Sequence, residues 1–192
     1  MNTQTTVRGL FLLLLFSRLA IPGLAASFSA ELVETRAGET RTCPFHYQDG
    51  SYRFDVVEDG QTRIITVDGA TGVMRVLVPS EKVYLEARFE EELSRSINPF
   101  NAFSYYRQTE DARLEGTESI GGLECRKVVV SKEGQVIITG WLTRGIGCPV
   151  KVETQGDART VELRNIKHGP QEAELFAVPD GYAPGKPQPL PE

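Results

Sequence analysis

The sequence of 192 residues lacks several features that would point to catalysis or metal binding. It has only two histidines, His46 and His168, which lie far apart among polar residues, and it contains no Gly-x-Ser-x-Gly motif. A serine hydrolase needs a histidine beside such a nucleophile, and a metal site needs clustered ligands. We therefore expect each histidine to be exposed or hydrogen-bonded. We predict that the protein is not an enzyme and uses no metal or other cofactor.

Cysteines are also few. Cys43, Cys125 and Cys148 are too widely spaced for a redox or zinc motif. An exported chain would meet an oxidising environment, in which a disulfide can persist. Because an odd number allows at most one bridge within the chain, we predict one structural disulfide and one remaining thiol. The spacing leaves the pairing open.

The chain also lacks a net positive charge and long apolar runs. The formal net charge of −5 argues against nucleic acid and against tight docking on anionic headgroups. The only apolar run, Leu10–Phe16, follows Arg8 and precedes small residues at 23–26 that are typical of signal-peptidase cleavage. It is shorter than the roughly 20 residues that a membrane-spanning helix needs. We predict a signal peptide over residues 1–26, cleaved near residue 25 or 26, and a periplasmic protein without stable membrane insertion.

Short alternating segments separated by turn residues are what the sequence does contain. Glu58-Asp59-Gly60 and Asp68-Gly69-Ala70-Thr71-Gly72 supply the Asp-Gly and Gly positions that tight reversals need, because glycine accepts positive φ without steric cost. Segments this short and this tightly joined pair with their sequence neighbours, which predicts an antiparallel meander with one apolar face. The predicted strands of this stretch are Tyr52–Val57, Arg63–Asp68, Val73–Val78 and Val83–Leu85.

An apolar sheet face needs a cover. The spacing of Phe89, Leu93 and Ile97 predicts a helix over Ala87–Ile97 that ends at Asn98-Pro99, because the residue before proline is disfavoured in the α region. The next segment, Phe100–Arg113, fits either a second helical turn or a loop. Both interpretations remain open.

The second half resumes the strand pattern, and the chain length fits one domain over residues 27–182. An ordered unit over Ala173–Tyr182 precedes a Pro-rich tail, 183–192, which we predict to be disordered or extended. The fold class is mainly β (α+β): nine or ten antiparallel strands form a strongly curved sheet or incomplete β-barrel, and one or two helices cover its concave face. The strands of this half are Glu124–Val130, Gln135–Leu142, Val150–Thr154 and Thr160–Asn165.

Four motifs occur in a familiar order. They are a hairpin with Asp68, Gly72, Leu77, Pro79, Lys82 and Tyr84, then Gly116–Cys125, then Trp141, Gly147, Pro149 and Lys151, and finally Leu175–Tyr182. In this order they resemble the LolA/LolB-like superfamily of bacterial envelope proteins, especially its uncharacterised LolA-like periplasmic domains. The resemblance implies an incomplete barrel around an apolar cavity, which in the carrier proteins holds acyl chains. Two departures stand out: no residue is assigned to the functional arginine of LolA, and no anchor cysteine like that of LolB is present.

The candidate ligand-binding residues are those placed on the concave side or its cover. Such residues form either ordinary core or a pocket for an apolar ligand, and the resemblance favours the pocket. The predicted function is binding of a hydrophobic small molecule, lipid or lipoprotein acyl chain. The alternative is a non-enzymatic envelope interaction or structural protein with a solid core, no ligand and a protein partner. The candidates are Phe54, Val56, Met74, Val76, Val78, Tyr84, Phe89, Leu93, Phe103, Ile138 and Trp141.

Overall fold

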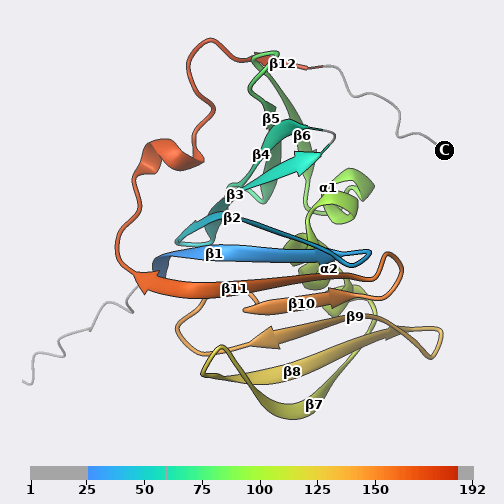
Figure 1. The fold of residues 1–192 in the computed structure, drawn as a ribbon. Coiled ribbons are helices and arrows are strands. Elements are labelled where there is room, and N and C mark those ends of the chain that lie inside the picture. Colours follow the sequence, from blue (N-terminus) through green and yellow to red (C-terminus); the bar gives the residue numbers. More distant parts are fainter. Residues whose placement is uncertain (1–25, 59, 186–192) are drawn as a thin grey trace, which may run out of the picture.

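One curved sheet forms the frame of the protein (Figure 1). The structure, a computed structural model, describes residues 26–58 and 60–185; the predicted signal peptide up to residue 25 and the tail from residue 186 lie outside this part. Twelve strands follow the order β12-β6-β5-β4-β3-β2-β1-β11-β10-β9-β8-β7. The fold is mainly β with helices, as predicted, and the sheet is not closed into a barrel.

The first six strands form a meander in which each strand pairs antiparallel with the next, and its last four, β3–β6, confirm the predicted meander. Asp49 and Gly50 both have positive φ in the two-residue turn between β2 and β3, as a turn that matches strand twist requires. These strands are β1 (Ser27–Arg36), β2 (Glu39–Gln48), β3 (Ser51–Glu58), β4 (Gln61–Val67), β5 (Val73–Val78) and β6 (Val83–Arg88).

The second half adds five strands and joins the first through the pairing of β1 with β11. Leu32 pairs with Leu163 at this junction, so both halves share one inner apolar face. Asp111–Ile120 forms a strand that our prediction left out, and it is the last strand at its edge of the sheet. The strands are β7 (Asp111–Ile120), β8 (Leu123–Lys132), β9 (Gln135–Leu142), β10 (Lys151–Thr154) and β11 (Arg159–His168).

Two helices cover the inner face: α1 (Glu92–Ile97) and α2 (Pro99–Thr109). The prediction of a helix from Ala87 was wrong at its start, because β6 continues to Arg88 and buries Ala87 opposite Met74. Strand pairing there outweighs the helical spacing of the apolar residues. The predicted end at Ile97 is confirmed. Asn98 then caps α2, its side chain accepting hydrogen bonds from two backbone N–H groups of that helix.

Aromatic side chains fill the centre of the concave face. Phe28 and Tyr47 stack with ring centroids 5.1 Å apart, and Tyr47 and Tyr52 continue the row at 6.4 Å. Phe100 and Phe103 complete the packing from the side of helix α2, and both are buried. The middle of the curved sheet is therefore solid core.

The C-terminal segment runs along the other face of the sheet (Figure 1). It contains a 3₁₀ helix, η1 (Ala173–Phe176), and β12 (Ala183–Pro184), which pairs in parallel with β6. Arg53, which alternates with the inward residues of β3, donates to the carbonyl of Leu175 at 3.3 Å. The start of the predicted tail is thus an ordered strand, and the sheet is not wholly antiparallel.

All three cysteines are free thiols, and the predicted disulfide is not formed in this structure. Cys148 precedes β10 next to Gly147, which lies against the Tyr47 hydroxyl, whereas Cys43 is four residues before Tyr47 on β2. At about 3.3 Å per residue this is roughly 13 Å along the strand, well beyond the reach of a disulfide. Cys125 is buried on β8, five strands from β2 in the sheet order.

No helix in the described part of the chain is both long enough and apolar enough to cross a membrane.

Candidate ligand-binding site

The inner face of the sheet changes from apolar to charged at one end of strands β1 and β11. Along β1 the inward positions run from Phe28 through Leu32 to Glu34, and along β11 they run from Leu163 back to Arg159. In both strands an apolar row ends in a charged residue that still faces inward. These strand ends, the β1–β2 hairpin and α1 together enclose a pocket.

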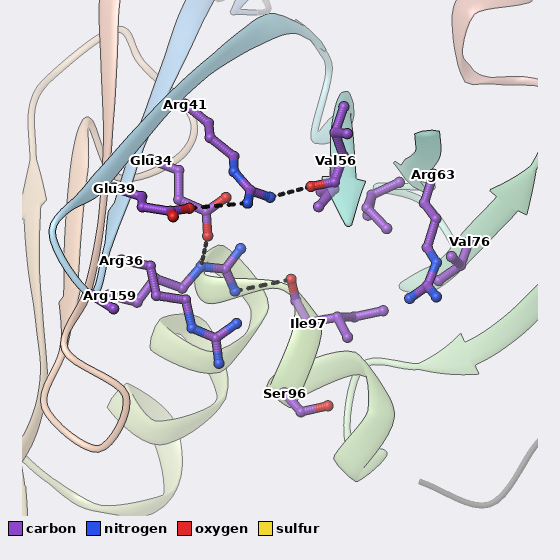
Figure 2. Close-up of a pocket in the computed structure, with 13 residues that line it drawn as sticks. Glu34, Arg36, Glu39, Arg41, Val56, Arg63, Val76, Ser96, Ile97 and Arg159 are labelled. Atoms are coloured by element: carbon purple, nitrogen blue, oxygen red, sulfur yellow. Dashed lines mark hydrogen bonds and ion pairs between the residues drawn. The ribbon is translucent and has the colours of Figure 1, made fainter. Parts of the chain in front are cut away.

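The pocket has a volume of about 430 Å³ and lies between the β1–β2 hairpin and α1 (Figure 2). Its aliphatic wall comes from β3, β4, β5 and α1, and consists of Val56, Ile65, Val76 and Ile97. The rest of its lining is mostly charged. The remaining lining residues are Glu34, Arg36, Ala37, Glu39, Arg41, Val57, Arg63, Ser96 and Arg159.

Arg159 links the sheet to α1 at the base of this pocket. Its side chain is 7% exposed, and its Nε lies 2.5 Å from Oε1 of Glu34, although the two are not aligned as a regular hydrogen bond. Its Nη1 donates to the carbonyl of Ile97 at 3.3 Å (Figure 2). A buried guanidinium needs such partners, because an unpaired charge away from water is costly. The C-terminal end of α1 is held over the pocket by this contact.

Two further arginines stand at the mouth. Arg41 donates to the carbonyl of Val57, and its Nη2 lies 3.2 Å from Oε2 of Glu39. Arg36 lies 3.6 Å from Asp157. Both arginine side chains are more than half exposed. Figure 2 shows Arg63 across the pocket from them, beside Val76.

A buried polar cluster fixes the joint between α1 and α2. Asn98 donates to the Tyr52 hydroxyl at 3.1 Å, and that hydroxyl donates to Oδ1 of Asn101 at 2.6 Å. Asn101 in turn donates to Oγ of Ser94 at 2.8 Å. Burial raises the pKa of Tyr52 far above its ordinary value, so its proton stays in the network. The two helices are therefore anchored to the sheet where they meet.

The structure brings only part of the predicted set together at the pocket. Val56 and Val76 line it, and Val78 is half-buried in phase with Val76 at the end of β5. Phe89 and Leu93 are half-buried near the start of α1, where Phe89 lies 6.1 Å from the ring of Tyr105. Four candidates lie within the solid core: Phe54, Met74, Phe103 and Ile138.

The remaining two candidates point to the opposite face. Tyr84 alternates with Leu85, the pairing partner of inward-facing Val76, and Trp141 alternates with Gly140, which lies against Phe103. Trp141 donates from Nε1 to Glu118 at 2.9 Å, and Lys151 lies 4.6 Å from its ring centroid.

Sequence reasoning missed the arginines of the pocket. Arg159 is in phase with the apolar residues of β11, Arg63 with Ile65 on β4, and Arg41 with Phe45 on β2. This shared phase is visible in the sequence and would have placed all three on the inner face. His46, by contrast, is hydrogen-bonded to Gln171 at 2.8 Å, away from the pocket.

The described residues offer no group of three or more His, Cys, Asp or Glu side chains arranged to hold a metal ion. The two carboxylates of the pocket, Glu34 and Glu39, are each paired with an arginine, Arg159 and Arg41. The arrangement can hold an apolar group and place charges beside it.

Comparisons with known proteins support the fold. No family model matches the sequence, and no curated protein matches it significantly. The structure is similar to that of an uncharacterised conserved protein from Thermus thermophilus, with a TM-score of 0.56 and 11% identity over 84% of this chain and 91% of that chain. This likeness shows a shared fold.

Structural matches with lower TM-scores include MucB and a LolA superfamily protein. MucB in the MucA/MucB complex of Pseudomonas aeruginosa gives a TM-score of 0.46 and 19% identity over 79% of this chain and 55% of that chain. A LolA superfamily protein from Nitrosomonas europaea gives 0.38 and 10% over 80% and 91%. The resemblance to LolA-like proteins that the motifs suggested thus recurs among the structural matches.

Proposed function

We propose that the protein is a non-catalytic binding protein of the bacterial envelope that holds the apolar part of a lipid, lipoprotein or other hydrophobic ligand. The binding place is the pocket between α1 and the charged end of the sheet, rather than the centre of the concave face. The observation that carries this proposal is the pocket itself, with its wall of Val56, Ile65, Val76 and Ile97.

Size and composition support a small ligand. About 430 Å³ lies within the range of roughly 300–1,000 Å³ typical of small-molecule sites, which combine apolar walls with a few polar groups. Exposed aliphatic surface next to an opening is also what an acyl chain would cover, and covering it gains about 25 cal/mol per Å² of apolar area. The structural matches to MucB and to a LolA superfamily protein suggest the general class of function. The proposed binding site depends on the pocket alone.

A second candidate function follows from the solid core. Phe28, Phe45 and Phe100 fill the middle of the concave face, so this part of the molecule leaves no room for a ligand. A protein that acts only by contact with a partner would need no such cavity. The ten residues of β7 form a sheet edge with almost every side chain exposed. An extended segment of an envelope protein could add to such an edge. The experiment below separates the two functions.

Native mass spectrometry of the exported protein, followed by organic extraction, tests ligand binding directly. We expect a stoichiometric extra mass that extracts as a lipid. A clean mass of the unliganded chain, together with no uptake of a fluorescent fatty acid, would leave the interaction protein as the better proposal.

A matched pair of substitutions tests the location. Ile97→Trp adds bulk to the pocket wall, so we expect it to lower fatty-acid uptake at least about tenfold while the protein stays folded. Leu114→Trp makes a similar change at an exposed position of β7, remote from the pocket, and should leave uptake unchanged. Equal uptake by wild type and Ile97→Trp would contradict the assigned pocket.

A further inference from the structure

We infer that the ligand is an anionic amphiphile, whose carboxylate or phosphate group binds Arg36 and Arg41 while its chain lies against the aliphatic wall. This inference rests on the proposed function and specifies the chemical class of the ligand.

The first argument is the local sign of the charge. The pocket is lined by four arginines and two glutamates, and Asp157 pairs with Arg36 beside it, so arginines outnumber acidic groups here in a chain whose formal net charge is −5. The positive charge is thus concentrated where the apolar wall is accessible. A cleft with an excess of one sign of charge raises the local concentration of ligands of the other sign.

The second argument concerns which arginines can change partners. Glu34 is paired with buried Arg159, and Arg159 also donates a hydrogen bond to the end of α1. This pair therefore has a structural role and is not available to a ligand. Arg36 and Arg41 instead pair with Asp157 and Glu39 at the surface, where such pairs contribute only about 0–1 kcal/mol. An incoming acid group can replace these carboxylates at small cost, while Arg41 keeps its hydrogen bond to the carbonyl of Val57. Guanidinium groups bind carboxylate and phosphate with two parallel hydrogen bonds, which are stronger.

The third argument favours an acid over a neutral end group. A chain seated against Val56 and Ile97 would end beside the guanidinium groups of the mouth (Figure 2). A neutral end group would take water from these groups without giving them an acceptor of matching charge, which is unfavourable. An acid end group supplies that acceptor. The two sides of the pocket therefore fit the two ends of one molecule.

The test compares ligands that differ only in the head group. Delipidated full-length protein is titrated with dodecanoic acid, methyl dodecanoate, dodecyl phosphate and inorganic phosphate, using displacement of a fluorescent fatty acid as the readout. We expect the acid to bind at least about tenfold more tightly than the methyl ester, as expected for loss of charge-assisted hydrogen bonds. The relative affinities of dodecanoic acid and dodecyl phosphate then assign the head group as carboxylate or phosphate.

Variants locate the head group. The double variant Arg36→Gln/Arg41→Gln should weaken dodecanoic acid binding at least about tenfold and leave methyl dodecanoate unchanged. The matched control is Arg113→Gln/Arg126→Gln, two exposed arginines on β7 and β8, which should change neither affinity. Thermal unfolding of both double variants confirms that they are folded.

The outcomes distinguish the two proposals. Equal affinity for acid and ester would overturn the inference and leave ligand binding intact, whereas binding of neither would overturn both. Displacement by inorganic phosphate alone at the concentrations at which dodecyl phosphate acts would show a free-anion site and overturn the amphiphile. Unchanged acid binding in Arg36→Gln/Arg41→Gln would also overturn the inference.

Discussion

The ring of Phe103 on α2 lies directly against the backbone of Gly140 on β9. A Cβ at Gly140 would stand 2.4 Å from two ring carbons, closer than real contacts allow. Phe103 is 1% exposed, so a shift of its ring would disturb the buried side chains around it. Glycine at this position sets how closely α2 approaches the sheet.

Gly140→Ala should therefore destabilise the protein by about 1–3 kcal/mol, the usual cost of overpacking a core. The control is Gly156→Ala in the turn between β10 and β11, where an added Cβ would meet no atom within 4 Å and φ is not in the left-handed region. Urea unfolding of both variants measures the difference. Equal stability of the two variants would show that α2 shifts freely on the sheet.

Arg159→Met should cost about 3–5 kcal/mol, because it leaves the carboxylate of Glu34 without its cation in a largely buried place. Adding Glu34→Met to this variant should recover part of the loss. Arg36→Met, which breaks a pair at the surface, should cost at most about 1 kcal/mol. Similar losses for Arg159→Met and Arg36→Met would mean that the Glu34–Arg159 pair is not the anchor of α1.

Alkaline pH should destabilise the fold through Tyr47. Burial raises the pKa of its hydroxyl from 10.0 to about 12. Below pH 10 both folded and unfolded chains keep the proton; above it the unfolded chain loses the proton first, so the free energy of unfolding falls until about pH 12. In Tyr47→Phe this contribution is absent, and its stability should fall less over the same window. Parallel pH profiles of the two proteins would contradict the shift.

The thiols give a chemical check of the cysteine assignment. Three thiols per chain should react with an aromatic disulfide reagent after unfolding without reductant. In the folded protein Cys43 should react slowly, since burial raises its pKa to about 11 and the reactive thiolate is scarce at neutral pH. A single reactive thiol in the unfolded chain would instead restore the disulfide predicted from the sequence.

The local signals in the sequence predicted the meander and the helix break correctly. The turn glycines Gly60 and Gly72, both of positive φ, and the pair Asn98-Pro99 act through backbone conformation alone, so their effect can be predicted without tertiary structure. The start of α1 could not, because the helical spacing begins at Phe89, directly after residues that also fit a strand paired with β5. Which of the two forms depends on that partner, and this is a tertiary contact.

The pocket was less predictable than the fold. Apolar alternation marks which residues face inward, but it does not tell Phe54, which fills the core, from Val56, which borders open space two residues later. That difference depends on whether an aromatic ring from α2 reaches the position. The inward arginines were predictable in principle from their phase, and were overlooked because charged residues at strand ends are usually solvated.

The distribution of aromatic residues gives the molecule two separate optical reporters. Its single tryptophan, Trp141, lies on β9 under Lys151, whereas the stacked rings of Phe28, Tyr47 and Tyr52 lie on β1, β2 and β3. Tryptophan fluorescence thus follows one half of the sheet, and near-ultraviolet circular dichroism of tyrosine follows the other. Coincidence of the two signals during denaturation would show that the pairing of β1 with β11 makes both halves unfold as one cooperative unit.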